Sequence, residues 1–96
     1  MIFLRVLAVF IFIVSVSAQA NVDEGQSAYE AGDYLSAFNL FTQAAENGDS
    51  KGQFLLGECY FNGRGVPQDF SLAVKWYTAS ADQEFVQAQE RLGNLY

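Results

Sequence analysis

The chain has 96 residues with a formal net charge of −6 at pH 7, and 51% of them are hydrophobic, so it has room for one small domain. The negative charge argues against nucleic acid as a partner, because binding to phosphates requires clustered Lys and Arg. The absence of histidine and the single cysteine, Cys59, exclude Ser-His and Cys-His nucleophile pairs, an ordinary zinc site and an intramolecular disulfide.

The first 20 residues have the pattern of a secretory signal peptide. Arg5 precedes an apolar run over residues 6–16, and the Ala-Gln-Ala sequence at 18–20 is the small-x-small pattern of a cleavage site. We therefore expect cleavage after Ala20 and a periplasmic or secreted product. The alternative is an uncleaved membrane anchor, because the whole apolar stretch approaches the roughly 20 residues that span a bilayer.

Five helices are predicted beyond residue 20, because apolar residues recur there at helical spacing between short turns. Pro67 and four of the eight glycines fall in those turns. Asp33 and Asp69 stand at expected N-cap positions, where a carboxylate accepts from the free amides of the helix that it begins. The predicted helices span residues 23–31, 34–47, 50–62, 69–82 and 86–95.

A sequence repeat connects these helices. The segment Leu56–Tyr60 (Leu-Gly-Glu-Cys-Tyr) returns 36 residues later as Leu92–Tyr96 (Leu-Gly-Asn-Leu-Tyr), and the second helices align at the same offset. A fixed period of this length indicates stacked helical repeats. We therefore expect an all-α fold, a short α-solenoid of antiparallel helix pairs with about two and a half repeats. The same alignment places Trp76 and Tyr77 in the core rather than on a ligand-stacking platform.

The most specific pattern in the chain is Leu56-Gly57-x-x-Tyr60-x-x-Gly63-x-Gly65-Val66-Pro67-Gln68-Asp69, running into Ala73-x-x-Trp76-Tyr77. It closely resembles the Sel1-like repeat family, which are relatives of the tetratricopeptide repeats with a longer turn inside the helix pair. The chain departs from the pattern at Glu84, where a glycine is expected. Members of this family serve as protein-binding scaffolds, so the resemblance implies an exported bacterial adaptor and not an enzyme.

The resemblance divides the chain into a signal peptide over residues 1–20 and a repeat domain over 21–96. Residues 49–84 form one full Sel1-like repeat, and residues 85–96 form the first helix of an incomplete one. Residues 21–48 look more like a tetratricopeptide unit, because the turn before their second helix lacks the insertion.

The binding surface is predicted by exclusion. On the first helix of each unit, residues not used in the Leu-Gly-Tyr packing are expected to face the concave side and to contact a protein or peptide. Phe54 and Phe61 would anchor this partner among polar neighbours, unless they pack against a neighbouring unit instead. The candidate partner-binding residues are Glu30, Lys51, Phe54, Glu58, Phe61, Asn62, Gln87, Glu90 and Asn94.

Charge adds one further expectation about the partner. Residues 21–96 carry four basic side chains against eleven acidic ones, a net charge of −7, and six of the acidic residues precede the first basic one, Lys51. A basic partner is therefore expected, and a solvated acidic surface without a partner is the alternative. Membrane contact is expected only through an uncleaved signal peptide.

Other functions are weaker alternatives. Family analogy suggests an enzyme or inhibitor in cell-wall or β-lactam chemistry, but the branch concerned relies on repeated cysteine pairs, and Cys59 is expected to be a buried apolar group. We predict no catalytic residues, no metal and no cofactor. A structural role in an envelope assembly is the third possibility. An exposed side of the last helix, built from Val86, Leu92, Leu95 and Tyr96, leaves open a monomer, a homodimer or part of a longer array.

Overall fold

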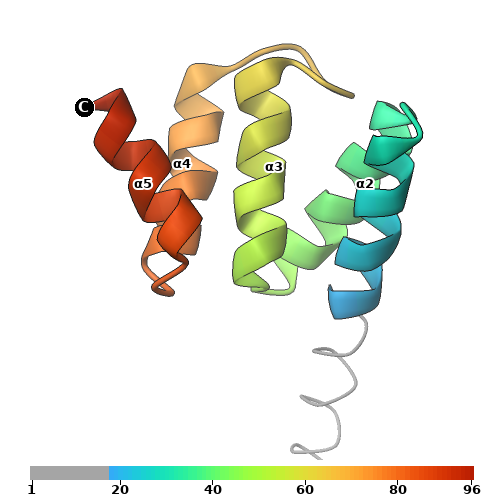
Figure 1. Ribbon diagram of the computed structural model, residues 1–96, viewed down its shortest axis with the longest axis horizontal. Helices are drawn as coiled ribbons and strands as arrows, with labels where there is room; N and C mark the ends of the chain where they lie inside the picture. The colour runs from blue at the N-terminus through green and yellow to red at the C-terminus, as the bar shows by residue number, and fades with distance from the viewer. Residues whose placement is uncertain (1–17) are drawn as a thin grey trace, which may run out of the picture.

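The computed structural model describes residues 18–96 and contains helices without any strand in that range. The described part of the N-terminal helix covers residues 18–30, and it is followed by α2 (Tyr34–Glu46), α3 (Ser50–Asn62), α4 (Phe70–Ala81) and α5 (Val86–Leu95). Figure 1 shows the N-terminal helix, α3 and α5 toward the viewer, with α2 and α4 behind them. The predicted all-α solenoid of helix pairs is confirmed.

The helices begin close to the predicted residues, because the same capping chemistry recurs. Oδ1 of Asp33, Asp49 and Asp69 accepts a hydrogen bond from the amide three residues later, at 3.2, 2.7 and 3.0 Å respectively. The caps predicted at Asp33 and Asp69 are therefore confirmed, and Asp49 is a third one. Each carboxylate also lies at the positive end of its helix dipole, which adds to its stabilising effect.

The N-terminal helix begins earlier than predicted. It already includes residue 18, because Ala18 and Val22 are buried together against Ala44 of α2. The helix thus runs through the predicted cleavage site at residues 18–20. None of the helices in the range from residue 18 onward is long and apolar enough to cross a membrane.

The turn at Glu84 keeps the geometry of a glycine turn. Gly48 ends the first unit with a φ of 86°, and Glu84, 36 residues later, adopts a φ of 63° although it carries a side chain. The left-handed conformation costs a non-glycine residue about 1–2 kcal/mol. The two turns are also joined, since Gln83 Nε2 donates to the carbonyl oxygen of Gly48 at 2.9 Å. The departure from the repeat pattern therefore costs stability but leaves the turn in place.

Two buried clusters follow the predicted repeat. Ala37 and Phe41 of α2 pack with Leu56 of α3, whereas the equivalent Ala73 and Tyr77 of α4 pack with residues of α3 and α5. Tyr77 is fully buried, as predicted. Trp76, also predicted as core, is partly buried against the first cluster.

Close approach of the paired helices depends on glycine. A Cβ atom at Gly57 would lie 2.7 Å from the ring of Tyr77, and one at Gly25 would lie 2.5 Å from the ring of Phe41, distances that real Cβ atoms do not tolerate. At Gly93, the third glycine of this kind, a Cβ atom would meet nothing within 4 Å. Equivalent glycines therefore differ in whether an aromatic ring lies on them.

Alanine substitutions at these glycines should separate packing from helix propensity. We expect Gly57→Ala to lower the free energy of unfolding by about 1–3 kcal/mol, because the Tyr77 ring must move. Gly93→Ala is the matched control, and it should raise the free energy of unfolding by about 0.5 kcal/mol through helix propensity alone. Urea denaturation followed by circular dichroism measures both. Equal effects of the two substitutions would contradict the packing explanation.

Candidate binding groove

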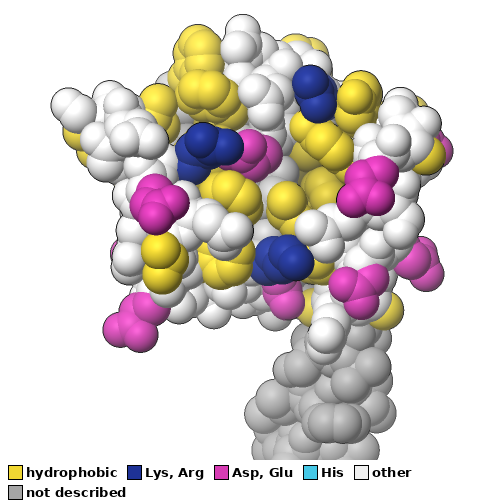
Figure 2. All heavy atoms as spheres, in the orientation of Figure 1, with side chains coloured by type: hydrophobic (Ala, Val, Ile, Leu, Met, Phe, Trp, Pro, Cys, Tyr) yellow, Lys and Arg dark blue, Asp and Glu magenta, His cyan; other side chains and the backbone are white. Residues whose placement is uncertain are grey.

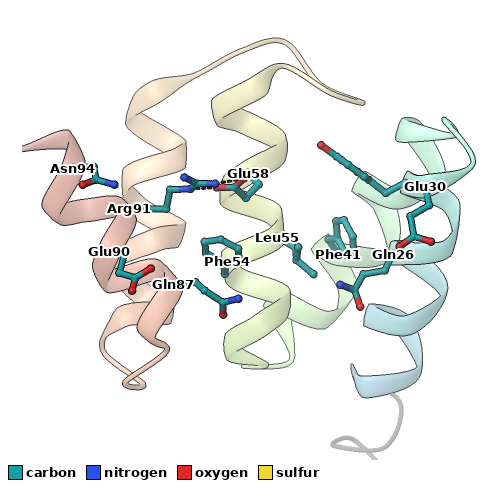
Figure 3. A pocket seen from close by; sticks show the side chains of 11 residues that line it. Gln26, Glu30, Phe41, Phe54, Leu55, Glu58, Gln87, Glu90, Arg91 and Asn94 are labelled. Carbon is teal, nitrogen blue, oxygen red and sulfur yellow. Dashed lines mark hydrogen bonds and ion pairs between the residues drawn. The ribbon is translucent and has the colours of Figure 1, made fainter.

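An open groove of about 450 Å³ crosses the face formed by the N-terminal helix, α3 and α5. Figure 2 shows hydrophobic side chains in the middle of this face, with acidic and basic ones around them. The side chains that line the groove come from the N-terminal helix, α3 and α5, which are the first helices of their repeats, and from α2 (Figure 3). They are Gln26, Tyr29, Glu30, Phe41, Phe54, Leu55, Glu58, Gln87, Glu90, Arg91 and Asn94.

The floor of the groove is apolar and belongs to the core. Phe54 is only 9% exposed, and its ring centroid lies 5.8 Å from that of Tyr77 and 5.3 Å from that of Phe85. Leu55 is half-buried and packs against every buried cluster of the described chain. Of the two roles considered for Phe54, packing against a neighbouring unit is therefore the one that the structure shows. Phe54 supports the groove from below and offers little surface to a partner.

One wall contains a charged hydrogen-bond network. Arg91 Nε and Nη2 of α5 donate to Glu58 Oε1 and Oε2 of α3 at 2.7 and 3.2 Å, and the hydroxyl of Tyr77 donates to Glu58 Oε1 at 2.7 Å. The side chain of Glu58 is 17% exposed and that of Arg91 is 49% exposed. The network joins α3, α4 and α5, so the Glu58 carboxylate is already bound within the chain.

The network has the expected effect on proton affinities. Burial raises the pKa of the Tyr77 hydroxyl, and its hydrogen bond to Glu58 raises that pKa further. The hydrogen bond and the charge of Glu58 raise the pKa of the Arg91 guanidinium. Both groups therefore keep their protons throughout the ordinary pH range and remain donors to Glu58.

Six of the nine candidate residues line the groove. Glu30 lies on the wall formed by the N-terminal helix, and Gln87, Glu90 and Asn94 lie on the opposite wall formed by α5 (Figure 3). Phe54 and Glu58 belong to its floor and wall as described above. The structure thus brings together residues that are up to 64 positions apart in the sequence.

Three candidate residues lie elsewhere. Lys51 lines a separate shallow cleft with Asp23 and Asp49. The half-buried ring of Phe61 packs against Phe70, with centroids 5.3 Å apart. Asn62 is exposed at the end of α3 and lines no part of the groove. Residues three, four and seven positions apart share one side of a helix, so these three residues differ from Phe54 and Glu58 in lying near the two ends of α3 (Ser50–Asn62), beyond the groove. Partner binding at these three positions remains a prediction.

Five lining residues were missed by sequence reasoning: Gln26, Tyr29, Phe41, Leu55 and Arg91. Gln26 follows Gly25 as Glu58 follows Gly57, and in the structure Gly25 packs under Phe41 as Gly57 packs under Tyr77. Gln26, Glu58 and Asn94 are therefore equivalent, each following the glycine of its helix. The offset between the first two copies is 32 residues rather than 36, so a search at a fixed period of 36 misses the first.

Cys59 shows no sign of a nucleophile. Its side chain is fully buried, and burial together with the nearby charge of Glu58 raises the pKa of its thiol to about 11. The prediction that Cys59 is a buried apolar group is confirmed. Within residues 18–96, no cluster of carboxylates and cysteine is arranged to hold a metal ion.

Known proteins resemble this chain in both sequence and structure. The model of the Sel1 repeat matches residues 23–49 and 50–85. DAP3-binding cell death enhancer 1 of Rattus norvegicus is 45% identical over 64 residues, which is 67% of this chain but 13% of the rat protein's length.

Two solved structures extend the comparison. A protective antigen present in uropathogenic Escherichia coli strains, which displays an SLR fold, superposes with a TM-score of 0.77 at 34% identity, over 82% of this chain and 18% of that one. A Sel1 repeat protein from Oxalobacter formigenes superposes with a TM-score of 0.75 at 33% identity, over 80% of this chain and 61% of that one.

Alkylation should show the burial of Cys59 directly. A pKa of about 11 instead of 9.0 lowers the reactive thiolate fraction at pH 8 about 100-fold, and the packed side chains hinder the reagent further. We expect no labelling of the folded protein by iodoacetamide during a time that fully labels the exposed thiol of a Ser71→Cys variant. Labelling should become complete in urea. Rapid labelling of the folded parent chain would contradict the buried position.

Proposed function

The chain belongs to the Sel1 repeat family, as its motifs predict, and from this premise we propose that it is an interaction scaffold that binds a segment of another protein in the groove. Repeats of this family generally mediate protein–protein interaction, and their fold is typically non-catalytic. The observation that carries the proposal is the groove itself. Its apolar floor is held in place by core packing. Its polar walls come from the N-terminal helix, α3 and α5, the first helices of successive repeats.

The relative from rat supports binding as the general role. Its name describes it as binding DAP3, and this chain matches it at 45% identity over 64 residues. The identity of any partner does not transfer, because the match covers 13% of that protein's length. The proposal for this chain is limited to the class of partner, a protein segment.

The alternative of an enzyme in cell-wall or β-lactam chemistry receives no support from the groove. Glu58 is engaged by Arg91 and Tyr77 rather than presented to a substrate. Cys59 is buried with a raised pKa. Neither residue therefore offers the open titratable group that general acid–base chemistry needs, and the two other carboxylates of the groove, Glu30 and Glu90, lie on opposite walls.

The proposal includes export, which rests on the signal-peptide pattern of residues 1–20. Cleavage after Ala20 would remove Ala18 from the cluster on α2 but would leave the buried Val22 in place. The helix at residues 18–30 presents no obstacle, because a signal peptide is removed while the chain is still unfolded during translocation.

Photo-crosslinking in the native host tests the groove. A benzoylphenylalanine at Gln87, which is exposed on the α5 wall, should give a crosslinked protein adduct that mass spectrometry identifies. The matched control places the same residue at Ser71, which is exposed on α4 away from the groove. Adducts of equal yield at both positions, or none at Gln87, would count against the groove as the binding surface.

Intact-mass measurement of the protein from its native host tests export. We expect a chain that begins at Asn21 and is recovered outside the cytoplasm, because the Ala-Gln-Ala pattern directs cleavage after Ala20. Replacing Ala18 and Ala20 by Glu should block processing and leave the precursor. A full-length chain in the cytoplasm would contradict the proposal without affecting the assignment of the groove.

A further inference from the structure

We infer that the groove selects a basic segment, one that places Lys or Arg side chains against Glu30 and Glu90 and an aliphatic neighbour on Leu55. This inference rests on the proposed function, since it specifies which protein segment the groove takes. It follows from which charges in the groove are already paired, from the shape of the lining, and from the charge of the domain.

The acidic groups of the groove differ in what they contact. Three carboxylates and one guanidinium line it, and the guanidinium, Arg91, forms its ion pair with Glu58. Glu30 and Glu90 remain, both exposed, and neither takes part in an ion pair within residues 18–96. They lie on opposite walls, on the N-terminal helix and on α5 (Figure 3). A segment lying across the groove therefore meets a negative charge on each side.

The other cations near this face lie outside the groove. The guanidinium of Arg64 lies 5.3 and 5.0 Å from the ring centroids of Tyr29 and Tyr34, and its Nη1 donates to the Tyr29 hydroxyl at 2.6 Å. Lys51 lies in the neighbouring cleft beside Asp23 and Asp49. Neither lines the groove, so neither neutralises Glu30 or Glu90 by direct contact.

The shape of the lining favours long basic side chains. Lys and Arg carry several methylene groups that cover apolar surface while the charged end reaches a polar rim. The floor around Leu55 supplies the apolar surface, and the carboxylates supply the rim. An acidic segment would instead bring like charges together on both walls, which is unfavourable. The remaining lining amides, Gln26, Gln87 and Asn94, are uncharged and leave this preference unchanged.

The charge of the whole domain acts in the same direction. Residues 21–96 have a net charge of −7, counted as four basic against eleven acidic side chains. A basic segment is therefore attracted before contact, and its association rate should fall as salt increases.

The test selects peptides from a random phage-displayed library on the folded parent chain. We expect the enriched peptides to contain Lys or Arg next to Leu, Ile, Met or Phe. Fluorescence anisotropy of the most enriched peptide should then show an affinity at least about 10-fold weaker for the double variant Glu30→Lys/Glu90→Lys, because two attractive contacts become repulsive.

The control is the double variant Glu24→Lys/Glu46→Lys, which changes the net charge by the same amount at exposed positions outside the groove. Its affinity should stay within about threefold of the parent, the difference reflecting long-range attraction alone. Circular dichroism confirms that both variants are folded. Equal weakening in the two variants would overturn the inference, because overall charge would then explain the binding.

The outcomes also separate the inference from the proposed function. Selected peptides that crosslink to benzoylphenylalanine at Gln87 but lack basic residues would overturn the inference and leave the binding groove intact. A library that yields no binding peptide, together with no adduct at Gln87 in the native host, would overturn both.

Discussion

The contact between a helix glycine and the aromatic ring of its partner helix is the constraint on which the other features depend. At Gly57 the missing side chain lets the Tyr77 ring lie against the backbone of α3. This close approach brings the Tyr77 hydroxyl to the carboxylate of the next residue, Glu58, which in turn binds Arg91 of α5. A packing requirement in the core therefore positions the charged wall of the groove. The same residues serve the fold and the site, so a change at the glycine should disturb both.

The first unit uses the same contact with different chemistry. Gly25 lies under Phe41, which has no hydroxyl, and the residue that follows Gly25 is the uncharged Gln26. Where the second unit pairs a tyrosine with a carboxylate, the first pairs a phenylalanine with an amide. Among residues 18–96 no ion pair joins the helices of this first unit, and Tyr29 is held instead by Arg64 from the inserted turn of the second unit. Each wall of the groove thus contacts a side chain from another helix pair: Arg64 contacts Tyr29 on the N-terminal wall, and Glu58 contacts Arg91 on the α5 wall.

Most of the fold could be predicted from the sequence, because its signals are local. Caps at Asp33 and Asp69 follow from backbone chemistry within three residues, and the burial of Phe41 and Tyr77 follows from helical spacing within one repeat. The groove was predicted only in part, because its members meet across helices. The role of Phe54 depends on the position of Phe85 in another turn, and Arg91 matters only because its side chain reaches Glu58. Such pairings depend on how each helix is rotated and shifted against its neighbours. The spacing of apolar residues along one helix does not determine this arrangement.

The α5 wall shows how this architecture sets the width of the groove. Helix α5 is held on one side only, through Ala88 and the half-buried Leu92 in the second cluster, while Val86, Leu95 and Tyr96 are exposed and Gly93 has open space around it. The Glu58–Arg91 pair is the one ion pair that ties α5 to α3 in the part of the chain that the structure describes. Because Gln87, Glu90 and Asn94 all project from α5, this pair and the packing of Ala88 together set how far they stand from the opposite wall. Glu58, predicted from the sequence as a contact for a partner, therefore also helps to hold the contacts of the α5 wall in position.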